Sequence, residues 1–278
     1  MYQKEKYPEF KQGLILLLIL FVLQILLAGF YGLMVTVTDV IPFEVEVKIL
    51  EYLILFLLGP IFAIGYTIKF ACDRADISLK DTIGKKVKSG SIYLYTTFLV
   101  VGLSIVMSEV DNFIMSYLPE ELAMEEMFVQ LLDNNLFIVL ISVGIIAPIL
   151  EEILFRGIIL KGFLKNYTVW KAITFSSLIF AIAHFNLRQG IVTFLMGFFL
   201  GWLYFKTKSL ILPIFAHIIN NSLAVFAFHF MNITGYSEVT PAAKEYQPLW
   251  LTLTGVFLIL AGYYLFKQWC QQSKIVEL

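Results

Sequence analysis

Two carboxylates and a guanidinium lie inside a strongly hydrophobic stretch of the chain, at Glu151, Glu152 and Arg156. A charged side chain at the centre of a membrane helix costs about 2.5 to 3.5 kcal/mol on insertion scales, so charges in such a segment indicate a functional site. Residues four apart share one face of an α-helix, so we expect Glu152 and Arg156 to pair. Glu151 is rotated from Glu152 by about 100° and points elsewhere, towards a cavity or another helix.

Two later hydrophobic segments each carry a histidine four residues from another residue of interest. His184 follows Phe180 by four residues, and His217 precedes Asn221 by four. Counted at 1.5 Å per residue from the nearest flanking lysine, Glu151, His184 and His217 lie about 15, 20 and 13 Å along their helices. These similar depths place all three side chains in one layer, where converging helices would form a single site.

These side chains support two kinds of hydrolysis, and the sequence leaves both open. In the first, Glu151 is a general base that takes a proton from water, which His184 orients. His217 and Asn221 then donate hydrogen bonds to the oxyanion, each worth about 2.7 to 4 kcal/mol in measured cases. In the second, Glu151, His184 and His217 bind a catalytic zinc ion with water as the fourth ligand. Either route cleaves a peptide bond without a serine or cysteine nucleophile.

Membrane helices must position these residues, because the composition is that of an integral membrane protein. Of 278 residues, 59% are hydrophobic and 15% charged, against about 45 to 50% and 25% in soluble domains. Eight segments approach or reach the roughly 20 apolar residues that span a bilayer. They are residues 14–34, 52–70, 92–107, 136–160, 172–185, 191–205, 210–230 and 249–266. We therefore predict an all-α polytopic membrane protein with one domain, residues 1–278, and the site on helices four, five and seven.

The distribution of positive charge agrees with eight spans. If the N-terminus is cytoplasmic, 16 of the 20 lysines and arginines fall in cytoplasmic segments, three lie outside and Arg156 is within a helix. The positive-inside rule describes such a bias. We therefore expect both termini on the cytoplasmic side of a prokaryotic cytoplasmic membrane.

Taken together, three motifs resemble those of the CAAX-protease and bacteriocin-processing (CPBP, or Abi) family of intramembrane endopeptidases. They are Glu151-Glu152-x-x-x-Arg156, Phe180-x-x-x-His184 and His217-x-x-x-Asn221, in that order along the chain. The resemblance covers residues 141–226, the motif-bearing core. It implies a helical site that opens to the cytoplasm and a membrane-bound peptide or protein as substrate.

The resemblance also implies roles for these residues. Glu151 becomes the catalytic base, while His184, His217 and Asn221 arrange the water and the oxyanion. Glu152, Arg156 and Phe180 become supporting residues. Family members have been described both as metalloproteases and as glutamate-dependent proteases. The zinc signature HExxH is absent, and zinc at Glu151, His184 and His217 stays open.

Three other functions remain as alternatives at this stage. Intramembrane Glu, Arg and His are also typical of ion-coupled secondary transporters, although the polar motifs here occupy only one half of the chain. Axial ligation of a haem by His184 and His217 would leave the charged residues of the first motif without a role. A non-catalytic bacteriocin-immunity protein could retain the same fold. The expected partners are the lipid bilayer and a membrane-bound substrate. We expect no nucleic-acid partner, and the oligomeric state is open.

Overall fold

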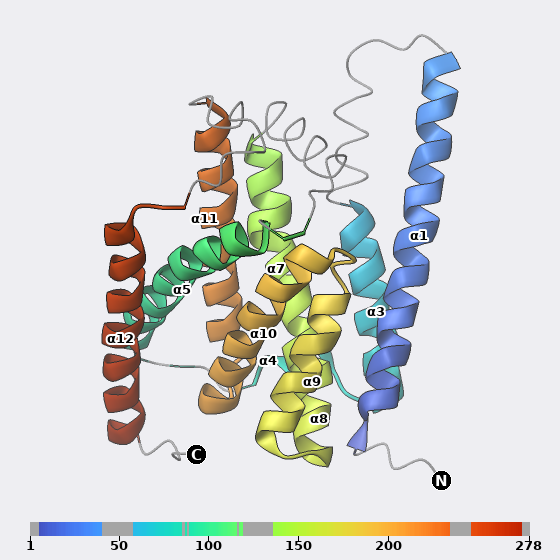
Figure 1. Ribbon diagram of the computed structural model, residues 1–278. Helices are drawn as coiled ribbons and strands as arrows, with labels where there is room; N and C mark the ends of the chain where they lie inside the picture. The colour runs from blue at the N-terminus through green and yellow to red at the C-terminus, as the bar shows by residue number, and fades with distance from the viewer. Residues whose placement is uncertain are drawn as a thin grey trace.

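The computed structural model of the protein describes residues 6–40, 58–84, 87, 89–115, 117–118, 136–233 and 246–273, which fold almost entirely into helices (Figure 1). Within these residues the only β-type pairing is an isolated antiparallel bridge between Gly84 and Ser209. The predicted all-α fold class is confirmed.

The helices follow one another along the chain with short connections in the core region. In order, they are α1 (Phe10–Val40), α3 (Gly59–Ala75), α4 (Leu79–Ile83), α5 (Ser91–Met115), η3 (Leu140–Ile146), α7 (Ala147–Glu152), η4 (Ile153–Leu160), α8 (Lys161–Asn166), α9 (Val169–Ile182), α10 (Leu187–Thr207), α11 (Ile211–Ile233) and α12 (Leu249–Gln272). The elements η3 and η4 are π-helices. With α7 and α8 they make one continuous helix, Leu136–Asn166.

Each of the eight predicted spans contains a helix, although residues 52–57 of the second lie outside the described part of the chain. Among the described residues, five helices are long and apolar enough to cross a membrane. They are Phe10–Leu33, Ser91–Ile114, Leu136–Asn166, Leu187–Thr207 and Leu249–Gln272. Two shorter apolar helices, Val169–Ile182 and Ile211–Ala227, accompany them. The chain is therefore an integral membrane protein, and the number of spans and their orientation stay predictions.

The continuous helix Leu136–Asn166 is the centre of the fold and carries the first motif (Figure 1). Its successive parts pack against α3, α9 and α11. Nearly every residue of η4, from Leu154 to Leu160, is buried. The helix that holds the two carboxylates is thus enclosed by elements that bring the other two motifs towards it.

The C-terminal helix α12 packs on α5, at the side of the bundle away from α1 (Figure 1). The two backbones approach closely at paired glycines, since a Cβ atom on Gly102 would lie 2.6 Å from the carbonyl oxygen of Gly255. Small residues commonly allow membrane helices to approach in this way. α5 in turn contacts α10 and α11, so this pair supports the helix that bears His217.

Candidate active site

Glu152 is the centre of a buried network of three charged or titratable side chains. Its Oε1 atom accepts a hydrogen bond from Arg156 Nη1 at 2.6 Å and lies 2.9 Å from His217 Nδ1 on α11. Glu152 is 0% exposed, Arg156 1% and His217 4%. The pairing expected from the four-residue spacing is therefore present. Because a buried charge without a partner is strongly destabilising, this pairing is what makes burial of Glu152 and Arg156 tolerable.

Arg156 is also held by the two helices of the α9–α10 hairpin. Its Nη2 atom donates to the carbonyl oxygen of Gly197 on α10 at 3.1 Å. Its guanidinium carbon lies 4.4 Å from the centre of the Phe180 ring on α9, a favourable cation–π position. One arginine thus links helices α9 and α10 to the helix that carries Glu152.

Gly197 provides the space that this arrangement needs. A Cβ atom at this position would lie 3.0 Å from Phe180 Cδ1 and 3.2 Å from Arg156 Nη2. We expect Gly197→Ala to cost about 1 to 3 kcal/mol, the usual range for overpacking a filled interior. The measurement is the free energy of unfolding in detergent. Gly65→Ala is the matched control, because among the described residues no heavy atom lies within 4 Å of its Cβ position. Equal losses of stability in the two variants would contradict the conclusion that the interior is filled around Gly197.

Glu151 differs from its neighbour in both contacts and exposure. Its side chain is 18% exposed, and its Oε2 atom lies 3.8 Å from His217 Nε2. A water molecule that hydrogen-bonds to both atoms fits this spacing. His217 thus stands between two carboxylates, with Nδ1 facing Glu152 and Nε2 facing Glu151.

The contacts of both histidines define which ring nitrogen can accept a hydrogen bond. A carboxylate only accepts hydrogen bonds, so the contact to Glu152 places a proton on His217 Nδ1 and leaves Nε2 as an acceptor in the neutral ring. His184 Nδ1 lies 2.9 Å from the carbonyl oxygen of Phe180. The proton of the neutral His184 ring is therefore also on Nδ1, and Nε2 is the acceptor. The Phe180 ring meets both imidazoles edge to face, at 4.9 Å from His184 and 5.8 Å from His217 between ring centres. Phe180 therefore contacts both histidines.

His184 occupies the corner between α9 and α10. The next residue, Phe185, has a left-handed φ of 55°, an uncommon conformation for a residue other than glycine. Its ring contacts that of Phe21 on α1, with centres 3.7 Å apart. The corner that presents His184 is thus packed against the first helix of the chain.

Asn221 fastens α11 to the π-helical part of the central helix. Its Nδ2 atom donates to the carbonyl oxygen of Val143 at 3.0 Å. In a π-helix this carbonyl would accept from residue 148, but Pro148 has no N–H group to donate. Pro148 therefore leaves a backbone acceptor that Asn221 satisfies. One N–H hydrogen of the Asn221 amide remains for another acceptor.

Two further residues orient this amide, and the sequence did not single them out as site residues. Asn220 Nδ2 donates to Asn221 Oδ1 at 3.2 Å, and Ser104 Oγ on α5 donates to Asn220 Oδ1 at 2.9 Å. The adjacent asparagines were the available signal for Asn220. Ser104 precedes them by more than a hundred residues, so no local pattern connects it to the site.

The described residues include all three candidate zinc ligands, Glu151, His184 and His217. Among the described residues, no group of three or more His, Cys, Asp or Glu side chains is placed to hold a metal ion. In both histidines Nδ1 contacts an oxygen atom, of Glu152 or of the Phe180 carbonyl, so Nε2 is the ring nitrogen that remains available. Binding of zinc by these three residues stays a prediction.

Two atoms of the buried network lack protein partners among the described residues: Glu152 Oε2 and Arg156 Nε. Buried polar atoms of this kind are usually satisfied by ordered water. Water bound at Glu152 Oε2 would lie next to the residues of the first motif, so the site is suited to holding water inside the membrane region.

The fold and the site are those of a helical membrane protein with a buried carboxylate–imidazole network. Comparison with known proteins relates part of this chain to a family. Residues 133–223 match the family described as type II CAAX prenyl endopeptidase, Rce1-like. This interval contains all three motifs, so the resemblance to the CPBP family is confirmed over this part of the chain.

Three relatives match over a similar length. A membrane peptidase of Bacillus subtilis (strain 168), YdiL, is 39% identical over 88 residues, which are 32% of this chain and 36% of the relative. The membrane-embedded CAAX protease MroQ of Staphylococcus aureus (strain USA300) is 36% identical over 108 residues, 37% of this chain and 43% of the relative. An Escherichia coli protein of 24.3 kDa is 33% identical over 107 residues, 36% of this chain and 49% of the relative. The chain thus spans less than half of each relative, and no solved structure matches it.

Proposed function

We propose that the protein is an intramembrane endopeptidase in which water activated by Glu151 hydrolyses a peptide bond of a membrane-associated protein or peptide. The observation that carries this proposal is the difference between the two adjacent carboxylates. Glu152 is fully buried and contacts both Arg156 and His217, whereas Glu151 is partly exposed beside His217 Nε2. A general base must reach water and must not be neutralised by an ion pair.

The proposed reaction assigns one task to each motif. Glu151 takes a proton from a water molecule as the water oxygen attacks the carbonyl carbon of the substrate. His184 Nε2 accepts a hydrogen bond from the same water and orients it. Glu151 then returns the proton to the leaving amine, so that the carboxylate is regenerated.

The oxyanion of the tetrahedral intermediate requires hydrogen-bond donors. The second N–H of the Asn221 amide is one, fixed by the contacts to Val143 and Asn220. His217 Nε2 is the other when the ring is protonated. Pre-positioned donors of this kind contribute about 2.7 to 4 kcal/mol each in measured enzymes. In this proposal Glu152 and Arg156 act only by holding His217 in place.

The catalytic core of the proposal is residues 141–226, within a single domain, and its site opens to the cytoplasm. Names of relatives that include a membrane peptidase and a CAAX protease support proteolysis as the activity. The substrate is then a peptide segment that reaches the site from the bilayer or its cytoplasmic surface.

The test compares membrane proteins and peptides from cells that carry the wild type, Glu151→Gln or Asp73→Asn. Asp73 is an exposed carboxylate outside the site, 67% exposed and paired with Lys69, and its substitution makes the same chemical change. We expect an uncleaved species to accumulate only with Glu151→Gln, and its sequence to identify the substrate. Identical peptide sets in all three cultures would overturn the proposed function.

A further inference from the structure

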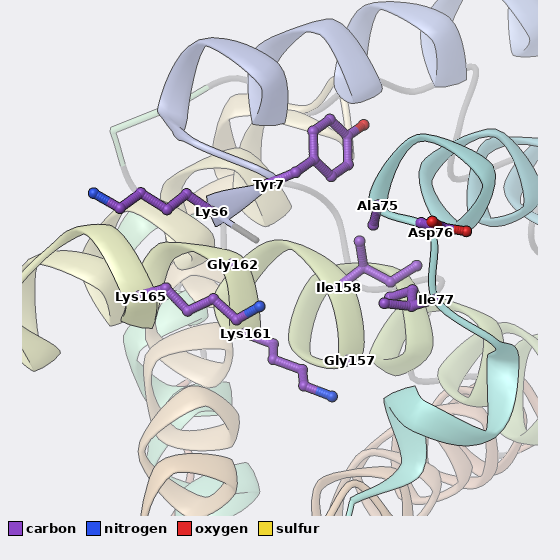
Figure 2. Close-up of a pocket in the computed structure, with 10 residues that line it drawn as sticks. All are labelled: Lys6, Tyr7, Ala75, Asp76, Ile77, Gly157, Ile158, Lys161, Gly162 and Lys165. Atoms are coloured by element: carbon purple, nitrogen blue, oxygen red, sulfur yellow. The ribbon is translucent and has the colours of Figure 1, made fainter. Parts of the chain in front are cut away.

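A cavity of about 690 Å³ lies outside the candidate active site, where the residues before α1, the end of α3 and the η4–α8 helix meet (Figure 2). Three lysines line it: Lys6, Lys161 and Lys165. Tyr7 and Asp76 are further polar lining residues. None of the motifs contributes to this cavity, and the proposed peptide hydrolysis makes no use of it.

The N-terminal wall of the cavity is built by specific contacts. Asn166 Nδ2 on α8 donates to the carbonyl oxygen of Lys6 at 2.7 Å. Pro8 packs directly on Gly162, where an added Cβ atom would overlap the proline ring. The Phe10 amide donates to the hydroxyl of Tyr167 at 3.2 Å. These contacts hold the segment that carries Lys6 against α8, so the basic character of the cavity is a feature of the fold.

The charge of the lining is positive, with three ammonium groups against the single carboxylate of Asp76. Lys161 and Lys165 are four residues apart and extend from the same helix, as Figure 2 shows. Lys161 Nζ also donates to the backbone carbonyl of Asp81, which holds its ammonium group beside α4. A ligand that gathers these ammonium groups must be an anion.

The position along the central helix places the cavity at the level of lipid headgroups. The helix Leu136–Asn166 has 31 residues, more than the roughly 20 that span a hydrocarbon core about 30 Å thick. Lysines near the ends of membrane helices extend to the interface, so we place the last turn and a half, which holds Lys161 and Lys165, in the interfacial region. Apolar side chains of α1 that begin just beyond the cavity, such as Ile15 and Leu18, are 44% and 59% exposed, which suits contact with acyl chains.

We propose that this cavity binds the phosphate of an anionic phospholipid headgroup. Basic pockets between membrane helices are suited to such headgroups, and each lysine near an anionic surface contributes about 1 kcal/mol. In Figure 2 the three ammonium groups point in different directions, so the lysines turn towards the phosphate when it binds, while the acyl chains continue along α1. The lipid fastens the N-terminal segment, α3 and α8 to one another at a single point.

The test is native mass spectrometry of the full-length chain in detergent, titrated with phosphatidylglycerol or with zwitterionic phosphatidylcholine. We expect a bound lipid with phosphatidylglycerol only. In the double variant Lys6→Gln/Lys165→Gln its affinity should fall by about 30-fold, which corresponds to about 1 kcal/mol per lysine. The charge-retaining double variant Lys6→Arg/Lys165→Arg should keep the affinity, which separates loss of charge from failure to fold.

Lys267→Gln is the matched control, since Lys267 is an exposed lysine on α12 and does not line the cavity. It should bind phosphatidylglycerol as the wild type does. Equal binding of the two lipids, or an equal loss in Lys267→Gln, would overturn the proposal. Displacement of the lipid by millimolar inorganic phosphate would assign the site to a soluble phosphate and would overturn the lipid as its source.

Discussion

Glu151→Gln is expected to slow peptide cleavage by about 10²- to 10⁴-fold, the contribution that a positioned general base typically makes. The amide has nearly the shape of the carboxylate but cannot take a proton from water. Initial rates of the purified variant on the accumulated substrate provide the measurement. The turnover number should fall while the Michaelis constant changes little, because Glu151 acts on water rather than on substrate binding.

The control for this prediction is the stability of the same variant. Glu151 is partly exposed, and its contact with His217 Nε2 is long, at 3.8 Å. Its substitution should therefore leave the unfolding temperature in detergent close to that of the wild type. A variant that cleaves at the wild-type rate would rule out Glu151 as the base.

Arg156→Met is expected to lower the free energy of unfolding by about 3 to 5 kcal/mol, the usual effect of removing one partner of a buried ion pair. The substitution leaves the Glu152 carboxylate at 0% exposure with His217 as its remaining partner. It also removes the contacts to Gly197 and Phe180 that join the α9–α10 hairpin to the central helix. Chemical unfolding in detergent, followed by tryptophan fluorescence, measures the loss.

Two further variants distinguish the buried charge from the lost packing. Glu152→Gln/Arg156→Met retains an acceptor for His217 but leaves no unpaired charge, so it should be more stable than Arg156→Met alone. Lys69→Met breaks a pair of the same four-residue spacing, Lys69–Asp73 at 2.8 Å, whose side chains are 73% and 67% exposed. Exposed pairs contribute at most about 1 kcal/mol. If Lys69→Met destabilised the protein as much as Arg156→Met, burial would not be the cause.

Much of the fold follows from local features of the sequence. The length and apolarity of the segments predict helices in a membrane, and each of the eight predicted segments contains one. The four-residue spacing of Glu152 and Arg156 predicts their pair, which is present at 2.6 Å. Both predictions succeed because hydropathy and helical periodicity are properties of a single segment and require no tertiary contact.

The roles within the first motif depend on contacts that no local pattern contains. Placing Glu151 and Glu152 in different environments requires His217, which approaches from a helix 65 residues away and lies 2.9 Å from one carboxylate and 3.8 Å from the other. Similarly, the carbonyl of Val143 becomes the acceptor for Asn221 because the helix is π-helical before Pro148. A π-helix changes which residues face a neighbour, and the spacing of an ideal α-helix does not anticipate that change.

The sequence by itself therefore determined the class of protein, the helical segments and the set of polar residues available for chemistry. Only the tertiary structure decided that Glu152 contacts Arg156 and His217, that Glu151 stays partly exposed, and that Lys6 joins Lys161 and Lys165 around one cavity. The reason is physical. Apolarity and periodicity are properties of a segment, whereas burial, exposure and the choice of partner arise when helices distant in the chain pack against one another.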